Sequence, residues 1–256
     1  MRVLSWAPFA PGFTQARHVV WREVRNADLS PDFDVDHWFT EEMARSPDAV
    51  GMLTSRDIGT HRLAEVSVDG ISAACLATVG LTNAEAVGRR RPYHSADFGT
   101  INLCTVVDAG LTETAQLEAL SIAVQARTAA VMEVGLQLDT GLATGTGTDC
   151  AALACDPGAG RYAGLHTALG EAIGAATRQA VAAAAAGPAA SKRLGLNIAL
   201  GLFIIAGGLG AWAVKEGIGP GLSGPGTVWM FAAGLLAVIG LCIPWPRSSR
   251  AAPSHA

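Results

Sequence analysis

Short apolar runs, several of them rich in Val, Ile and Thr, occur at seven places before residue 155. Runs of this length and composition are typical of β-strands. The expected strands are Arg2–Trp6, Ala16–Val24, Ala49–Thr54, Leu63–Val68, Ile71–Val79, Thr100–Val107 and Cys150–Ala154. The early part of the chain is interpreted as antiparallel strands in succession.

Three longer stretches predict helices instead, because their apolar residues recur near helical spacing or because helix formers lie between Pro and Gly breaks. They are Asp34–Ser46, Thr112–Val134 and Leu165–Ala186. Thr112 and Thr167 are suited to cap the second and third helices, and Gly135 follows the second. The succession of elements predicts an α/β (or α+β) soluble domain with a mixed sheet and two long helices.

The pattern changes beyond Gly187, where polar positions almost disappear. Leu194–Val214 is 21 residues without a charge and Thr227–Ile243 is 17. A helix of about 20 apolar residues spans the hydrocarbon core of a bilayer. The sequence therefore predicts a domain over residues 1–187, followed over 188–256 by a linker, two transmembrane helices (about 194–214 and 227–243) and a short basic tail. The alternative is a buried hairpin of a larger soluble core.

Charge separates the same two parts. The first 187 residues carry 13 Lys and Arg against 21 Asp and Glu, whereas the remainder carries 5 against 1. Lys192 and Arg193 precede the first expected span, and Arg247 and Arg250 follow the second. Because positive flanks stay on the cytoplasmic side, we expect a multi-pass protein of the inner or plasma membrane, with the domain and both termini cytoplasmic. Residues 1–13 lack the apolar core of a signal peptide.

Several classes of site are not indicated. The five Cys are odd in number and include no C-x-x-C pair, which favours reduced thiols over a disulfide framework. The six His form neither H-x-x-x-H nor H-E-x-x-H, so no metal ligand set is expected. No phosphate-binding glycine motif occurs. The run Arg89–Arg91 is the sole basic cluster of an acidic domain and is interpreted as solvated, with no nucleic-acid partner.

The densest group of polar residues is ATGTGTD, Ala143–Asp149. Alternating Gly and Thr expose backbone N–H groups and hydroxyls, which can line a polar ligand or stabilise an oxyanion. The simpler interpretation is a tight turn that leads into the next strand.

A second candidate is GLHTALGE, Gly164–Glu171. His166 comes just before the expected helix start, where it would project from an element end, although a solvent-exposed His needs no function. Glu171 is favoured in the first turn by the helix dipole alone. Asn83 in GLTNA and Asn102 in GTIN follow or begin strands and are either amide readers or satisfied turn residues.

The order of LSWAPFAPGF, ATVGLTNA, FGTIN, ATGTGTD and LHTALGE resembles the adenosylcobinamide amidohydrolase family, the CbiZ type, over about residues 1–185. The resemblance implies hydrolysis of the amide that joins an aminopropanol arm to the corrin ring of adenosylcobinamide, which yields adenosylcobyric acid for corrinoid salvage in cobalamin biosynthesis. It implies no cofactor, because the cobalt corrinoid is the substrate. Residues 87–102 lack the Gly-Asp expected in the family, and Asp97 is the candidate to replace it.

The resemblance and the motifs together suggest catalytic roles. His166 is expected to act as general base or acid, oriented by Asp149 or Glu171. Thr146 or Thr148 is expected to be a nucleophile or hydroxyl donor, and a water nucleophile is equally consistent.

The remaining candidates are expected to contact the substrate, the glycines through amides near the oxyanion. They are Asn83, Thr100, Asn102, Gly145 and Gly147. The expected partners are adenosylcobinamide or a related corrinoid, the lipid bilayer, and membrane proteins of corrinoid transport or assembly. Two other interpretations remain: a non-catalytic, membrane-tethered corrinoid-binding module, and a tethered protein whose hairpin is the functional part.

Overall fold

A computed structural model describes residues 1–24, 33–92 and 99–187. The chain divides into two units, residues 1–188 and residues 189–256, and only the first contains described residues. The spans predicted at 194–214 and 227–243 lie outside the described residues. Within the described part, no helix is both long and apolar enough to cross a membrane.

The centre of the first unit is a six-stranded mixed sheet with the order β2-β1-β12-β8-β6-β5. β12 and β8 are parallel, and every other neighbouring pair in this sheet is antiparallel. The strands are β1 (Arg2–Ser5), β2 (Gly12–Gln15), β5 (Arg62–Val68), β6 (Ile71–Val79), β8 (Ile101–Leu111) and β12 (Cys150–Pro157). β12, the last strand among the described residues, therefore lies between β1 and β8.

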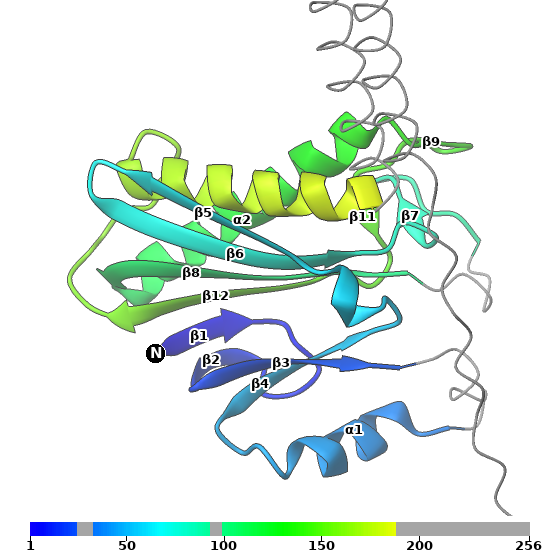
Figure 1. Cartoon of the computed structure of the whole chain (residues 1–256), viewed down its shortest axis with the longest axis horizontal. Coiled ribbons are helices and arrows are strands. Elements are labelled where there is room, and N and C mark those ends of the chain that lie inside the picture. The colour runs from blue at the N-terminus through cyan, green and yellow to red at the C-terminus, as the bar shows by residue number, and fades with distance from the viewer. Residues whose placement is uncertain (25–32, 93–98, 188–256) are drawn as a thin grey trace, which may run out of the picture. The chain divides into compact units, whose positions relative to one another are not determined.

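Two long helices cover one face of this sheet (Figure 1). α2 (Glu113–Val134) crosses from β8 to β12, and a later helix occupies residues 168–187. Their buried faces consist largely of alanine, whose small side chain lets a helix approach the sheet closely. These residues are Ala115, Ala119, Ala123 and Ala130 on α2, and Ala172, Ala176, Ala180 and Ala184 on the later helix.

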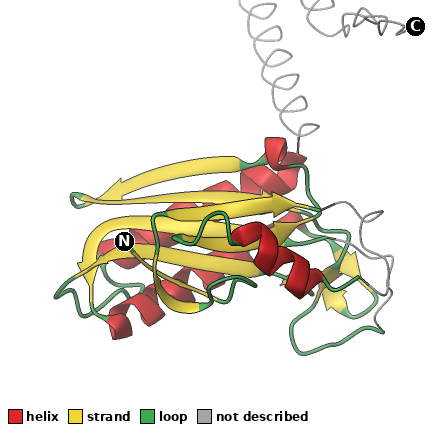
Figure 2. Cartoon of the chain, turned by 90° about the horizontal axis from the view of Figure 1, so that it is seen from below, coloured by secondary structure: helices red, strands yellow, loops and turns green. Residues whose placement is uncertain are grey.

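The opposite face carries a smaller layer. β3 (His18–Glu23) and β4 (Ala49–Thr54) form a parallel pair that packs on the sheet through Val50 and Met52. α1 (Val35–Met43) packs on the far side of this pair through Phe39 and Met43. Figure 2 shows α1 in front of the sheet and the longer helices behind it.

Short elements complete the first unit. β7 (Ala84–Glu85) pairs with β11 (Gly145–Thr146), and β9 (Gln137–Leu138) pairs with β10 (Gly141–Leu142). A 3₁₀ turn, η2, spans Ile58–Thr60. The β7–β11 pair brings the segment after β6 against the Gly-Thr segment that precedes β12. Beside it, two arginines of the basic run are bound to backbone, Arg89 to the Thr140 carbonyl (2.9 Å) and Arg91 to the Ala84 carbonyl (2.9 Å).

The predicted mixed sheet and its two long helices are confirmed. Thr112 caps α2 by accepting from the Ala115 N–H, Gly135 ends that helix at φ 74°, and Thr167 accepts from the Gly170 N–H. Because Thr167 caps it, the last helix begins at residue 168 and not at Leu165.

Other predictions about the strands are wrong. β3 and β4 are parallel, because α1 connects them, so the early strands are not all antiparallel. β2 was not predicted, since Gly12 and Pro11 hide its pattern. β8 runs to Leu111 and β12 to Pro157, several residues beyond the apolar runs that predicted them.

Candidate active site

A cavity of about 360 Å³ lies at the end of the sheet where β8 and β12 begin. Several chain segments meet there: the residue after β1, the end of β4, the segment after β6, and the starts of β8 and β12. Its polar lining comes mainly from Asn83, Thr100, Asn102, Thr148 and Asp149. Five of the sequence-predicted site residues therefore share one cavity.

Three of these side chains are joined through backbone carbonyls. The Thr100 hydroxyl donates to the Thr148 carbonyl (2.6 Å) and also lies 3.3 Å from the Asn102 side-chain oxygen. The Asn102 amide donates to the Leu53 carbonyl at 2.6 Å, and Asn102 is fully buried. The Thr148 hydroxyl donates to the Gly99 carbonyl at 3.0 Å, but Thr148 itself is exposed. A ligand in the cavity can thus reach Thr148 directly, whereas Asn102 forms part of a fixed floor.

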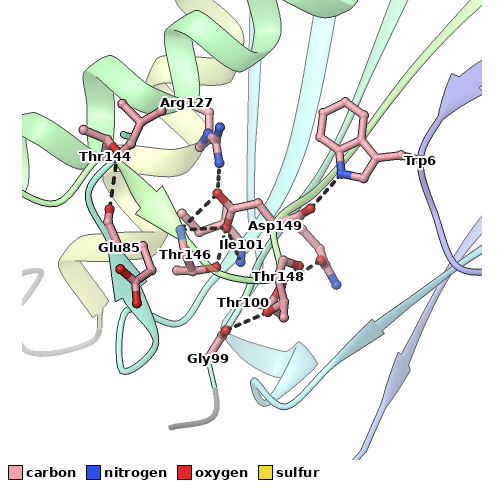
Figure 3. Close-up of polar contacts among 12 residues, drawn as sticks. Trp6, Glu85, Gly99, Thr100, Ile101, Arg127, Thr144, Thr146, Thr148 and Asp149 are labelled. Atoms are coloured by element: carbon pink, nitrogen blue, oxygen red, sulfur yellow. Dashed lines mark hydrogen bonds and ion pairs between the residues drawn. The ribbon is translucent and has the colours of Figure 1, made fainter. Parts of the chain in front are cut away.

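Asp149 lies beside this floor at the centre of a second network (Figure 3). Its carboxylate forms an ion pair with Arg127 of α2, and both side chains are largely buried, with 12% and 14% exposure. The same carboxylate accepts from the Thr146 hydroxyl, from the Thr146 N–H at 3.1 Å and from the Ile101 N–H at 3.3 Å. Burial lowers the pKa of the Arg127 guanidinium below its ordinary value.

This network makes Asp149 a positioning group. A carboxylate has about four lone-pair sites, and protein donors occupy them here. A Cβ on Gly145 would lie 2.5 Å from the Asp149 carboxylate and 2.9 Å from the Arg127 guanidinium, so only glycine lets the ion pair lie against this backbone. The carboxylate thereby holds the turn that presents Thr148 to the cavity.

The oxyanion role predicted for the glycine amides is not supported by the geometry. The Gly147 N–H already donates to the Asn83 carbonyl at 3.1 Å, and Gly145 is buried in the β7–β11 pair. Both glycines instead allow close packing, since a Cβ on Gly147 would lie 3.1 Å from the Asn83 side-chain nitrogen.

His166 and Glu171 are separated from the cavity. Both are exposed, and they lie just before and within the first turn of the helix over residues 168–187. The other end of that helix reaches the cavity end of the sheet, where Ala185 lines a hollow together with Gly80 and Gly99. At 1.5 Å per residue the helix separates His166 from Ala185 by roughly 28 Å. The structure therefore does not bring Asp149 and His166 together, because they lie beyond opposite ends of β12.

Two residues of the site were missed from the sequence. Arg127 is the single basic residue within the long apolar helix α2, and that isolation was the available signal. Trp6 donates its indole N–H to the Asp149 carbonyl at 2.7 Å. Nothing in its local pattern indicates a partner 143 residues away.

The other ionisable groups offer no activated nucleophile in the described lining. Burial raises the pKa of the Cys150 thiol to about 12, so it is protonated at neutral pH. Cys75 and Cys104 are also buried, with pKa values raised to about 11 and about 12. Among the residues described, no group of three or more His, Cys, Asp or Glu could hold a metal ion. Asp97 lies outside the described residues.

The chain matches the model of a known protein family. A family model described as adenosylcobinamide amidohydrolase (CbiZ) matches residues 1–192, a range that includes the sheet, both long helices and the cavity. No curated protein matches the chain.

Proposed function

The chain belongs to the adenosylcobinamide amidohydrolase family, and from this premise we propose that it cleaves the aminopropanol arm from adenosylcobinamide in the cavity where β8 and β12 begin. Members of this family act on an amide C–N bond, so the chain is a hydrolase of corrinoid salvage. In the proposed reaction, water adds across the amide. The carbonyl carbon keeps the new oxygen as the carboxylate of adenosylcobyric acid, and the nitrogen leaves as protonated aminopropanol.

One observation carries this proposal: a small cavity whose floor consists of neutral amides and hydroxyls. About 360 Å³ is near the lower limit for a drug-sized ligand, and a corrin ring with its side chains is larger. The arm and its amide fit such a space, while the ring stays at the mouth. Neutral donors and acceptors match a neutral amide better than charged side chains would, because no charge has to be desolvated.

The polar residues divide into two roles. Thr148 supplies the hydroxyl next to the scissile amide, and its hydrogen turns from the Gly99 carbonyl to the developing oxyanion, which stabilises the tetrahedral intermediate. The buried Thr100 keeps its bond to the Thr148 carbonyl and so holds Thr148 in place. Asn83 holds an amide of the substrate, while the fully buried Asn102 supports the floor through its bond to the Leu53 carbonyl. The attacking oxygen is either water or the Thr148 hydroxyl, and the latter would form an ester with the corrinoid carboxyl before water releases it.

Asp149 and Thr146 are positioning residues that do not contact the substrate. Their mutual hydrogen bond, supported by the ion pair with Arg127, sets the conformation of the turn that carries Thr148. His166 and Glu171 are left outside this proposal because they lie at the other end of the sheet.

The direct test is to add adenosylcobinamide to the purified protein and follow the products by chromatography with mass detection. Release of aminopropanol and adenosylcobyric acid is expected. Tight binding without cleavage would favour the alternative, a non-catalytic corrinoid-binding module. A folded protein that neither binds nor cleaves adenosylcobinamide would refute the proposal.

Thr148 is tested with matched variants. Thr148→Val should lower kcat/KM by about 100-fold and Thr148→Ser much less, because only the hydroxyl is essential. Thr40→Val is the control, since Thr40 is exposed on α1 and its hydroxyl donates only to the Asp36 carbonyl of its own helix. An acyl-enzyme found by intact mass after rapid quenching would assign the nucleophile to Thr148. An undiminished rate in Thr148→Val would exclude its hydroxyl from catalysis.

We also propose that residues 194–214 and 227–243 anchor the enzyme in the inner or plasma membrane, near corrinoid transport or assembly proteins. This anchoring is supported by the length of the two uncharged stretches and by the basic residues that flank them. The chain ending at residue 187 should leave the membrane fraction, keep its activity in vitro and salvage corrinoids less well in cells. Equal salvage by both forms would argue against a role for the anchor.

A further inference from the structure

The cavity has a second, chemically different wall. Besides the amides and hydroxyls, its lining includes apolar residues from segments around β1, β3, β4 and α1. These residues are Trp6, Pro8, Val24, Val35 and Leu53. A ligand that fills the cavity therefore meets both hydrogen-bonding groups and apolar surface, including an aromatic ring.

Trp6 is the exceptional member of this wall. Trp6 is 46% exposed, whereas tryptophan residues are on average well buried. Its ring is nevertheless held in place, because the indole N–H donates to the Asp149 carbonyl at 2.7 Å. Figure 3 shows Trp6 and Arg127 approaching Asp149 from different sides. The residue that positions the catalytic turn thus also orients an exposed aromatic ring.

An exposed aromatic ring in a fixed orientation favours ligand binding. Aromatic side chains contribute a large contact area, and few rotamers need to be frozen when a ligand arrives. The hydrogen bond to the Asp149 carbonyl satisfies the polar edge of the indole, while nearly half of the residue remains exposed to a ligand.

We propose that Trp6 is a specificity-determining platform on which the corrin ring of the substrate rests while its arm occupies the polar floor. The inference depends on the proposed function, because it takes the scissile arm to lie beside Thr148. The corrin ring is the occupant because it is too large for a cavity of about 360 Å³ and must remain at the rim, where Trp6 lies. Its methyl-rich edge and conjugated plane match an indole face and the neighbouring Pro8 and Leu53.

The test measures affinity separately from cleavage. The probe is dicyanocobinamide, which has the corrin ring and the arm but cyanide in place of the adenosyl group. Its Kd is measured with the full chain by titration of tryptophan fluorescence and corrin absorbance. Trp6→Ala should weaken binding by about tenfold or more, since it removes most of the aromatic contact. Trp6→Phe should lose less, because it keeps a ring but not the bond to Asp149.

Tyr162→Ala is the matched control: Tyr162 is an exposed aromatic residue that follows β12 at the far end of the sheet. Its Kd should equal that of the wild type. With adenosylcobinamide, Trp6→Ala should raise KM by a similar factor and change kcat less, as expected for binding energy shared by ground and transition states. Circular dichroism of each variant checks that the fold is retained.

An unchanged Kd for dicyanocobinamide in a folded Trp6→Ala variant would overturn the inference. If that variant lost affinity only for adenosylcobinamide, Trp6 would contact the adenosyl group and the corrin assignment would be wrong. The inference and the proposed function can fail separately. Weaker binding in Trp6→Ala without cleavage by the wild type would refute only the function, whereas cleavage with unchanged Kd would refute only the platform.

Discussion

The two ends of the six-stranded sheet differ in how their loops are held. At the end where β12 begins, the segment 143–149 is tied through Asp149 to α2, to β8 and to Trp6, the residue after β1. At the end where β12 finishes, the segment 158–167 packs backbone against backbone through glycine and leaves His166 exposed. The two segments are neighbours in the sequence and both contain residues typical of active sites. Polar residues thus become a site only where other elements converge on them.

The largest effect is expected from breaking the ion pair at the cavity end. Arg127→Met leaves the Asp149 carboxylate buried without its cation, and loss of one partner of a buried pair costs about 3–5 kcal/mol. Urea unfolding measures this change in the free energy of unfolding. Arg178→Met is the control, because its pair with Glu133 is exposed to solvent and should change stability far less.

A double variant distinguishes charge from packing. Adding Asp149→Asn to Arg127→Met removes the uncompensated charge and should restore part of the lost stability. If Arg127→Met cost no more than Arg178→Met, the buried ion pair would not be what holds the segment at the cavity end.

The next effect concerns the glycine contacts at the other end. A Cβ on Gly170 would lie 2.2 Å from the Gly164 carbonyl oxygen, so Gly170→Ala should force the backbone apart and cost about 1–3 kcal/mol. Gly174 lies one turn further along the same helix, and its nearest contact would be an ordinary 3.7 Å. Gly174→Ala should therefore stabilise by up to about 1 kcal/mol, since alanine favours helix. The measurement is the midpoint of thermal unfolding, Tm. Equal Tm values for Gly170→Ala and Gly174→Ala would contradict this packing.

A smaller effect should appear at alkaline pH, because β12 carries a thiol near each end. Burial raises the pKa of Cys150 to about 12, while for Cys155 the rise from burial is opposed by nearby Arg2. The unfolded state releases its thiol protons above about pH 9 but folded Cys150 does not, so stability declines between about pH 9 and 12. At pH 10 the raised pKa of Cys150 lowers the free energy of unfolding by about 1.4 kcal/mol relative to pH 7.

The measurement is urea unfolding at pH 7 and pH 10 under reducing conditions. For each variant, the free energy of unfolding at pH 10 is compared with its own value at pH 7. The difference should shrink more in Cys150→Ala than in Cys155→Ala. Equal flattening by the two variants would mean that Arg2 does not offset the burial of Cys155.

The smallest effect is expected at His166, because its side chain is exposed and roughly 28 Å of helix separates it from the cavity end. His166→Ala should change kcat/KM for adenosylcobinamide by less than about twofold. A drop comparable to that of Thr148→Val would move the chemistry to the far end of the sheet, as the sequence alone suggested.

Local rules predicted the elements well. Thr112, Gly135 and Thr167 act as the caps expected from their types and positions, and β4 and β6 have the predicted bounds. These signals depend on neighbours within a few residues. The parallel β3–β4 pair was not predictable in this way, because pairing depends on the helix between the strands and on the face that it covers.

The candidate site was predictable only in part, for a related reason. Thr100, Asn102 and Thr148 were identified because polar residues at strand starts are conspicuous. Trp6 and Arg127 were not, since each acts on Asp149 across a long separation in the chain. His166 was misplaced because a motif does not reveal at which end of its strand it will lie.

The central position of β12 has a consequence for biosynthesis. β1 and β2 on one side, and β8, β6 and β5 on the other, are joined in the sheet only through this last strand. As the chain leaves the ribosome, the two hairpins can form early, but the sheet stays divided until residues 150–157 have emerged. Pairing of β1 with β12 then closes a loop of more than a hundred residues, a late and entropically costly step. Nascent chains that stop before β12 would expose both unpaired edges, and chaperones would have to protect them.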